Sequence, residues 1–291
     1  MSSSSPSITT ANPAQNIYDD HSFFAAYSTL PRSEHGLAGA PEWPVLRDMI
    51  TGPSSGMQAR RILDIGCGYG WFARWARDHG AMHVRAIDLS EKMIQRAKEL
   101  DASHGVIDYQ IQDVETFAPS DHERGEYDLV YSSLVFHYIE DLGRLLREIR
   151  SCLVGSSHTS SSDSSLSEFT TPTTKRKGKL VFSIEHPICT APISPPPDWA
   201  VVGDETHTER KIWPLNNYSE EGLRLTSWLG TAGVRKYHRT VETYVSLLLE
   251  NGFVLTALKD WVPSLEDVRD HPEWREERHR PYFLLVAAEI A

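Results

Sequence analysis

Leu63-Asp64-Ile65-Gly66-Cys67-Gly68-Tyr69-Gly70 forms a D-x-G-x-G-x-G pattern at the point where an expected strand meets an expected helix. The apolar run at residues 62–65 predicts the strand, and the helix is expected from Trp71 to His79, ending at Gly80. Glycines in such a turn let the backbone approach a ligand closely because they carry no side chain. The turn is therefore a candidate ligand site.

Two common phosphate-binding patterns do not fit this turn. The dinucleotide fingerprint G-x-G-x-x-G needs a third glycine at position 71, where the sequence has Trp71. No Lys-Ser or Lys-Thr pair follows the glycines, as a P-loop requires. A dinucleotide-dependent oxidoreductase is therefore kept only as an alternative enzyme class that the turn does not favour.

Strands and helices alternate along the rest of the chain. Strands are expected at residues 83–89, 109–112, 127–132, 179–184, 253–261 and 282–289, and helices at residues 91–100, 139–153 and 241–249. Ser90 and Thr240 are the expected N-caps of two of these helices. This order predicts an α/β domain with a mainly parallel sheet.

Four segments depart from this alternation. Residues 1–16 are expected to form a disordered tail, and the aromatic-rich residues 17–57 an N-terminal cap. Residues 155–177 are dominated by Ser and Thr and are expected to be a disordered insertion. Residues 187–239, rich in Pro and Trp, form a long irregular excursion, which we interpret as a substrate lid.

Composition narrows the partners and the compartment. The net charge of −11 repels a phosphate backbone, so nucleic acid is not an expected partner. Three cysteines without a C-x-x-C pair indicate a reducing, cytoplasmic environment. The N-terminus lacks a signal-peptide pattern, and no apolar stretch approaches the roughly 20 residues needed to cross a bilayer, so no membrane partner is expected.

In this combination of features the sequence resembles the class I S-adenosylmethionine-dependent methyltransferases, in particular their small-molecule, ubiquinone-biosynthesis-like (type 11) branch. The resemblance covers about residues 58–153 and 178–186 of a domain expected to span residues 58–291. It implies a Rossmann-like sheet, mainly parallel with an antiparallel C-terminal strand. It also implies S-adenosylmethionine (AdoMet) as methyl donor and S-adenosylhomocysteine as product.

The resemblance places the methionine part of AdoMet against the glycine turn. The residues implied there are Asp64, Gly66, Cys67, Gly68 and Gly70. The backbone of the turn, rather than its side chains, would supply most of these contacts.

Further donor contacts are implied at the ends of the next strands. Asp88 would bind both ribose hydroxyls, because a carboxylate can accept two hydrogen bonds from a vicinal diol. Leu89 would lie against the adenine, Asp113 would bind the adenine amino group, and the amide of Val114 would bind the ring. Ser132 would offer its carbonyl oxygen to the ammonium group of the donor.

The N-terminal cap could close over the donor through three residues. These are Tyr18, Tyr27 and Arg32, with the arginine free to pair with a carboxylate of AdoMet or of the substrate. Core packing is the alternative for the tyrosines, and a solvated surface position for the arginine. In the lid, an aromatic wall around a planar or cationic acceptor could come from Trp199, Trp213, Trp228 and Tyr237.

Three histidines are candidates for contact with the methyl acceptor. His137 follows the fourth strand, His186 follows the fifth, and His238 precedes the helix at residues 241–249. A histidine can accept a proton near neutral pH, although each of these could instead be structural. His238 is the first choice, because the basic neighbours Arg235, Lys236 and Arg239 could hold an anionic acceptor.

The predicted function is methyl transfer to an oxygen or nitrogen nucleophile of a small molecule by in-line displacement. The segment at residues 132–137 lacks the Asp/Asn-Pro-Pro-aromatic signature of amino-methylating nucleic-acid enzymes, and it also lacks the paired glutamates of protein arginine methyltransferases. An AdoMet-binding regulatory protein without turnover is the alternative. We expect no metal ion and either a monomer or a homodimer.

Overall fold

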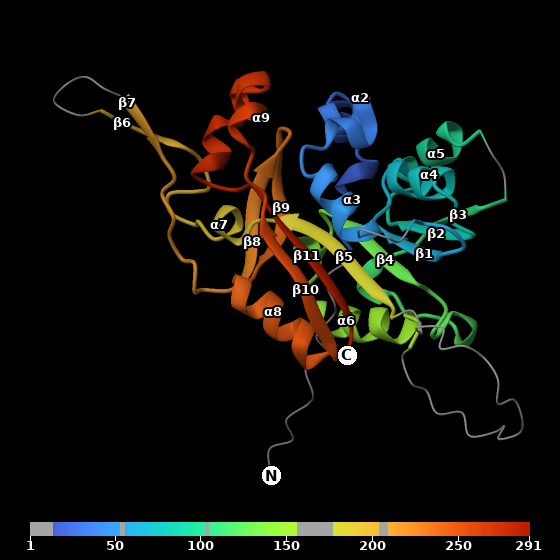
Figure 1. The fold of residues 1–291 in the computed structure, drawn as a ribbon. Coiled ribbons are helices and arrows are strands. Elements are labelled where there is room, and N and C mark those ends of the chain that lie inside the picture. Colours follow the sequence, from blue (N-terminus) through green and yellow to red (C-terminus); the bar gives the residue numbers. More distant parts are fainter. Residues whose placement is uncertain (1–13, 53–55, 103–104, 156–176, 204–208) are drawn as a thin grey trace, which may run out of the picture.

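The computed structural model describes residues 14–52, 56–102, 105–155, 177–203 and 209–291. Its centre is a 7-stranded sheet in the order β10-β11-β5-β4-β1-β2-β3 (Figure 1). The strands are β1 (Arg61–Ile65), β2 (His83–Asp88), β3 (Ile107–Ile111), β4 (Leu129–Ser133), β5 (Lys179–Glu185), β10 (Phe253–Asp260) and β11 (Phe283–Ile290). In this sheet only β11 runs antiparallel to its neighbours, which confirms the predicted fold class.

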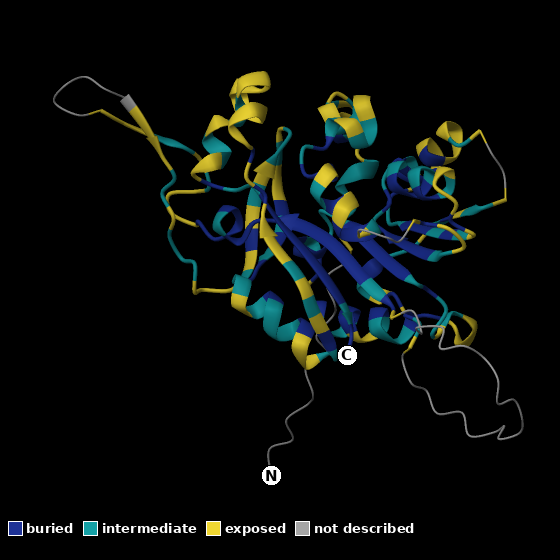
Figure 2. Cartoon of the chain, viewed as in Figure 1, coloured by how far each residue is buried: buried dark blue, intermediate teal, exposed yellow. Residues whose placement is uncertain are grey.

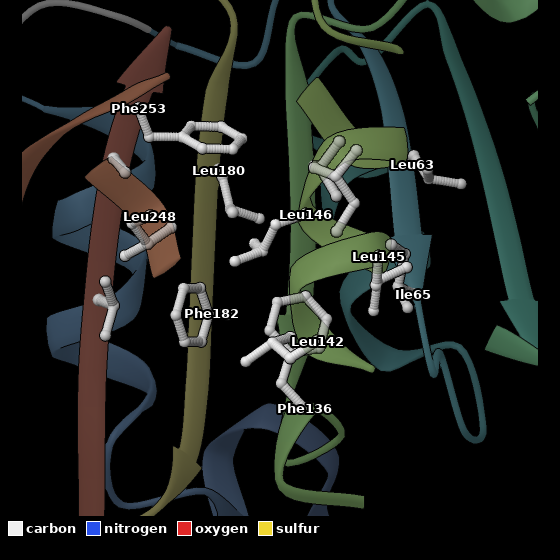
Figure 3. Close-up of a cluster of buried hydrophobic side chains, with 14 of the residues drawn as sticks. Leu63, Ile65, Phe136, Leu142, Leu145, Leu146, Leu180, Phe182, Leu248 and Phe253 are labelled. Carbon is white, nitrogen blue, oxygen red and sulfur yellow. The ribbon is translucent and has the colours of Figure 1, made fainter. Parts of the chain in front are cut away.

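Helices cover both faces of this sheet. One face is covered by α6 (Leu142–Cys152) and α8 (Val241–Glu250), whose apolar side chains meet those of the strands in the core shown in Figure 3. The other face is covered by α3 (Trp43–Thr51), α4 (Trp71–Asp78) and α5 (Glu91–Leu100). Because both faces are buried, the central strands carry nearly continuous apolar runs rather than an alternating pattern.

Several expected element boundaries differ from the structure by one to three residues, and two of these differences have a clear physical reason. The third strand was expected at residues 109–112, but β3 spans residues 107–111 because it pairs in parallel with β2 from Val84 onward. The helix expected from residue 139 begins at Leu142, since the side chain of Asp141 accepts a hydrogen bond from the amide of Arg144. Three short helices lie between β3 and α6 in the sequence: η3 (Val114–Thr116), η4 (Asp121–Glu123) and η5 (Phe136–Tyr138).

Residues 17–39 of the expected N-terminal cap form short helices that lie beside α4 and α5 (Figure 1), whereas α3, also expected in the cap, packs on the sheet. The short helices are η1 (Ile17–Asp19), α1 (His21–Ser28), α2 (Pro31–His35) and η2 (Gly36–Gly39). Residues 1–13 of the expected tail lie outside the described residues. Gln15, also expected in the tail, pairs with the backbone of Arg235, whose amide donates to its Oε1 at 2.6 Å.

The segment at residues 187–239 is more regular than its sequence indicates. Its elements are α7 (Pro187–Thr190), β6 (Ala200–Gly203), β7 (Glu209–Ile212), β8 (Gly222–Trp228) and β9 (Thr231–His238). The expectation of an irregular excursion is wrong for residues 222–238, because β8 and β9 pair along their whole length as a hairpin. The β6–β7 pair projects from the body and is largely exposed (Figures 1 and 2).

Two more elements, α9 (Leu265–Asp270) and η6 (Pro272–Arg278), lie between β10 and β11. Among the described residues, no helix combines the length and the apolar composition that crossing a membrane requires.

The residues that flank the Ser/Thr-rich insertion lie next to each other. Residues 156–176 lie outside the described residues, but the amide of Gly178 donates to the carbonyl of Val154 at 3.0 Å. We expect deletion of residues 157–174 to leave the melting temperature and the affinity for AdoMet nearly unchanged, since this segment has few apolar residues to bury. Thermal melts and calorimetry check this, and a large loss of stability would show that the segment packs on the domain.

Candidate functional site

The turn between β1 and α4 holds its glycines in a backbone conformation that other residues avoid. Gly66, Gly68 and Gly70 have φ angles of 70°, 54° and 72°, in the left-handed region. The amides of Gly66 and Cys67 donate to the carbonyl of Ile87 at 2.8 and 2.9 Å. The turn is therefore fixed against the end of β2.

Two of these glycines also have neighbours that leave no room for a side chain. A Cβ atom at Gly66 would lie 2.1 Å from Cγ2 of Val135. A Cβ atom at Gly70 would lie 2.6 Å from the hydroxyl of Tyr109, on β3. Gly70 is the N-cap residue of α4, so it closes the turn onto the sheet.

A cavity of about 820 Å³ lies at the carboxyl ends of the parallel strands, between the glycine turn, the N-terminal cap and the β8–β9 hairpin. Its lining includes most of the residues singled out from the sequence: Tyr18, Tyr27, Arg32, Asp64, Gly66, Cys67, Gly68, Asp88, Leu89, Asp113, Val114 and His137. Four others are not part of its lining: Gly70, Ser132, His186 and His238. Parallel α/β sheets bind ligands at this edge.

The acidic side chains at the ends of β2 and β3 each accept backbone hydrogen bonds. Asp88 accepts from the amide of Gly68 through Oδ2 and from the amide of Ser90 through Oδ1, both at 2.9 Å. Desolvation in the cavity wall raises the pKa of Asp88, although these two hydrogen bonds oppose the shift. Asp113 accepts from the amide of Glu115 at 2.9 Å and so begins η3.

Asp64 carries an unsatisfied acceptor at the cavity. Its side chain is on β1, only 2% of the residue is exposed, and its Oδ2 has no hydrogen-bond partner among the described residues. Burial, together with the nearby charge of Asp88, raises the pKa of Asp64 well above its ordinary value. A buried oxygen without a partner costs free energy, and a bound cation or hydrogen-bond donor would remove that cost.

The wall at the end of β4 is formed by residues just after Ser132. Ser132 is fully buried, and its hydroxyl donates to the carbonyl of Ile65 at 2.9 Å, which ties β4 to β1. Ser133, Leu134 and Val135 line the cavity instead. Leu134 has a φ of 60°, an uncommon conformation for a branched residue, of the kind that clusters at ligand sites.

Arg32 lines the cavity but is not a free cation, contrary to the expectation from the sequence. Its guanidinium forms an ion pair with Glu42, which is fully buried, and donates to the hydroxyl of Ser133 at 3.1 Å. A buried carboxylate needs such a partner, because removing the partner leaves an uncompensated charge. Arg32 therefore joins the cap to the end of β4.

Two of the three candidate histidines have both ring nitrogens engaged away from the cavity. His238 is fully buried, with Nδ1 at 2.8 Å from the hydroxyl of Thr190 and Nε2 at 2.8 Å from the carbonyl of Tyr218. His186 accepts from the amide of Ile188 through Nδ1, and its Nε2 lies 2.9 Å from Asp260. The geometry therefore does not favour His238 as the histidine that contacts the acceptor. Its hydrogen bond to Thr190 instead joins β9 to α7.

His137 is the histidine that the structure brings to the cavity. It is 3% exposed, and its Nδ1 accepts a hydrogen bond from the amide of Glu185 at 3.3 Å. Burial, with the nearby charges of Lys236 and Arg239, lowers the pKa of His137 well below its ordinary value. The ring is therefore neutral, and because Nδ1 is an acceptor, its proton resides on Nε2.

The cap and the hairpin meet over the cavity through aromatic rings. Trp228, at the end of β8, lies with its ring centroid 5.2 Å from that of Phe23 and 6.1 Å from that of Tyr27. Tyr18 contacts the same tryptophan at 6.3 Å. Edge-to-face contacts of this kind stabilise the packing of the cap against the hairpin.

Trp199 and Trp213 do not belong to the aromatic wall that the sequence indicated. Their rings pack against the guanidinium of Arg280, at 5.2 and 4.6 Å, and neither lines the cavity. Trp228 and Tyr237 do line it. These two tryptophans therefore contact a side chain of the protein, Arg280, and not a ligand in the cavity.

Two cavity residues had no role assigned from the sequence, and a third was considered only as one of several basic residues. Glu185 is the last residue of β5, and the strand-end argument that selected His186 applies equally to it. Lys236 was expected only as part of a basic cluster that could hold an anionic acceptor; it lines the cavity and pairs with Glu185 at 2.6 Å. Tyr282 precedes β11 and had no sequence signal.

Among the described residues, no group of three or more His, Cys, Asp or Glu is placed to hold a metal ion.

Known proteins are similar to this chain in both fold and sequence. Residues 63–157 match a family model described as a methyltransferase domain. An S-adenosylmethionine dependent methyltransferase from Mesorhizobium loti is 37% identical, with a TM-score of 0.71, over 87% of this chain and 100% of that chain. A Listeria monocytogenes structure described as the same class is 34% identical, with a TM-score of 0.69, over 88% and 99% of the two chains.

A further relative matches only in part. The malonyl-[acyl-carrier protein] O-methyltransferase of Erwinia billingiae is 38% identical over 32% of this chain and 34% of its own length. The two structural relatives, in contrast, align over nearly their whole length and over 87% and 88% of this chain. The chain therefore belongs to the S-adenosylmethionine-dependent methyltransferases, and AdoMet is its methyl donor.

Proposed function

We propose that the protein transfers the methyl group of AdoMet to an oxygen or nitrogen nucleophile of a small-molecule metabolite. The observation that carries this proposal is the cavity of about 820 Å³, which joins the glycine turn and two carboxylates to an aromatic space under the cap and hairpin. When bound, AdoMet supplies an electrophilic methyl group on a sulfonium. The chain then has to position the acceptor in line with that methyl group.

The donor half of the cavity fits AdoMet by its hydrogen-bonding capacity. Each carboxylate oxygen of Asp88 already accepts one amide and keeps a lone pair for one hydroxyl of a ribose diol. The unpaired Oδ2 of Asp64 suits the ammonium group of the donor. Gly66 and Gly68 leave room for the methionine part, and Leu89 and the other lining residues that follow β2 and β3 would hold the adenosine.

The acceptor half is bounded by rings from the cap and the hairpin, including Tyr18, Tyr27, Trp228 and Tyr237. Such a lining suits a small organic molecule better than a polymer. The charge of −11 disfavours nucleic acid, and we expect a monomer or homodimer acting without a membrane partner. The partial match to a malonyl-carrier-protein enzyme does not carry its acceptor over, since the alignment covers about a third of each chain.

Methyl-labelled AdoMet incubated with the protein and a fractionated cell extract tests the proposal. We expect a labelled small molecule, identified by mass spectrometry, and much less label with the Asp88→Ala variant. AdoMet binding without label in any small-molecule fraction would instead indicate an AdoMet-binding protein without turnover. Label confined to macromolecules would place the acceptor in a polymer.

The raised pKa of Asp64 predicts a pH dependence of donor binding. Below that pKa the carboxyl is neutral, and binding the cationic ammonium must first release its proton, so AdoMet affinity should fall on acidification. The contribution of Asp64 to the stability of the ligand-free protein should change in the opposite direction. A raised carboxyl pKa means that the folded state binds the proton more tightly than the unfolded state, so this group's contribution to stability rises as the pH falls. Calorimetry across the pH range measures the fall in AdoMet affinity. The Asp64→Asn variant should bind AdoMet more weakly, and its affinity should depend less on pH.

A further inference from the structure

A buried ion pair faces the cavity at the junction of the sheet and the hairpin. Nζ of Lys236, on β9, lies 2.6 Å from Oε2 of Glu185, at the end of β5, and both side chains are about nine-tenths buried. A buried ion pair contributes little to stability, because the lost solvation of both charges offsets their attraction. Its presence in a ligand cavity therefore calls for a functional explanation.

The pair leaves hydrogen-bond donors available to the cavity. A lysine ammonium has three N–H groups, and Glu185 is the one hydrogen-bond partner of Lys236 Nζ among the residues that the structure describes. His137 adds a donor from η5: its Nδ1 accepts the amide of Glu185, so Nε2 carries the proton and has no partner in the described part of the chain. Glu185 thus positions both donors, one through its carboxylate and one through its backbone.

Two tyrosine side chains near these donors keep their hydroxyl groups protonated. The charge of Glu185 and burial raise the pKa of Tyr282 well above its ordinary value, and burial does the same for Tyr138. Both tyrosines line the cavity. Because neutral hydroxyls can also donate, this part of the cavity is rich in hydrogen-bond donors and in aromatic surface.

We propose that Lys236 and His137 bind an anionic oxygen of the methyl acceptor, which makes the acceptor an aromatic carboxylate or an acidic phenol. This inference rests on the proposed methyltransferase function. The acceptor binds already ionised, so no residue has to remove a proton during transfer. A lone pair of the bound oxygen forms the new C–O bond while the C–S bond of AdoMet breaks and its electron pair stays on sulfur. A sulfonium and an oxyanion thus become a neutral thioether and a methyl ether or ester.

A chromophoric phenol tests the inference without knowledge of the natural acceptor. With S-adenosylhomocysteine saturating the protein, 4-nitrophenol is titrated near its own pKa, where absorbance reports its ionised fraction. We expect it to bind as the phenolate, at least about 10-fold more tightly than 4-nitroanisole, which has the same ring without the oxyanion. The bound phenol should be more ionised than the free one, because N–H groups of Lys236 and His137 would donate hydrogen bonds to its charged form and oppose the charge of Glu185, which raises the pKa of Tyr282.

Variants then assign this preference to the ion pair. Lys236→Met should lose the preference for the phenolate over 4-nitroanisole. The double variant Lys236→Met/Glu185→Gln should lose this preference as well, and it leaves no unpaired buried carboxylate. Lys211→Met is the matched control, since Lys211 is an exposed lysine of β7 that pairs with Glu276 at 2.9 Å outside the cavity.

The outcomes separate this inference from the proposed function. The inference is overturned if the double variant, with normal S-adenosylhomocysteine affinity, still prefers the phenolate. It is also overturned if the wild-type complex binds both probes equally or binds neither. No binding of S-adenosylhomocysteine to the wild-type protein would instead contradict the proposed function itself.

Discussion

Gly66→Ala is expected to destabilise the protein by about 2–5 kcal/mol and to weaken AdoMet binding strongly. The alanine would have to adopt a φ of 70°, which costs about 1–2 kcal/mol for a residue with a Cβ atom. That Cβ would also lie 2.1 Å from Cγ2 of Val135, and overpacking of this kind typically costs about 1–3 kcal/mol. Denaturant unfolding and calorimetry with S-adenosylhomocysteine measure the two effects.

Two further variants separate the backbone cost from the clash. Gly230→Ala, at the tip of the β8–β9 hairpin, changes a glycine with a φ of 78° and nothing within 4 Å of the new Cβ, so it should show the backbone cost alone. Gly66→Ala/Val135→Ala removes the clashing methyl groups and should recover part of the lost stability. If Gly66→Ala costs no more than Gly230→Ala, the turn is not held as tightly as its contacts indicate.

Asp88→Ala is expected to weaken S-adenosylhomocysteine binding by about 1–3 kcal/mol, roughly 5-fold to 150-fold, while the protein still folds. The variant loses the carboxylate proposed to accept the ribose hydroxyls. It also leaves the amides of Gly68 and Ser90 without their acceptor, so the glycine turn itself loses support. Calorimetry with the purified variant measures the loss of affinity.

A second aspartate serves as the matched control. Asp128, just before β4, accepts the amide of Arg61 at 2.9 Å at the opposite end of the sheet from the cavity. Asp128→Ala should lower the stability and leave donor affinity unchanged. A folded Asp88→Ala protein with wild-type affinity would restrict the role of Asp88 to organising the turn.

The comparison of Gly68 with Gly66 shows what a motif leaves open. From the sequence alone, Gly68→Val is expected to be damaging, because a branched side chain would fill the space that the donor needs. In the structure, the nearest atom to a Cβ at Gly68 belongs to Trp71 at 3.5 Å, an ordinary contact. Left-handed φ angles constrain both positions, but only Gly66 is crowded, by Val135 from a loop distant in sequence.

The sequence by itself determined the parallel sheet, the turn between β1 and α4, and the positions of Asp64 and Asp88. These features depend on short-range information: apolar runs, glycines in a turn and caps at helix ends all act within a few residues. The carboxyl ends of parallel strands then meet at one edge, whatever the packing details. The antiparallel last strand came from the family resemblance and was also confirmed.

Only the tertiary structure decided which side chains share the cavity. His137, His186 and His238 look equivalent in sequence, yet hydrogen bonds from segments far along the chain hold two of them elsewhere and leave His137 at the cavity. Arg32 is neutralised by Glu42, and Lys236 meets Glu185 across 51 positions of the chain. Such pairings depend on long-range packing, and one-dimensional periodicity carries no information about which distant partner satisfies a buried polar group.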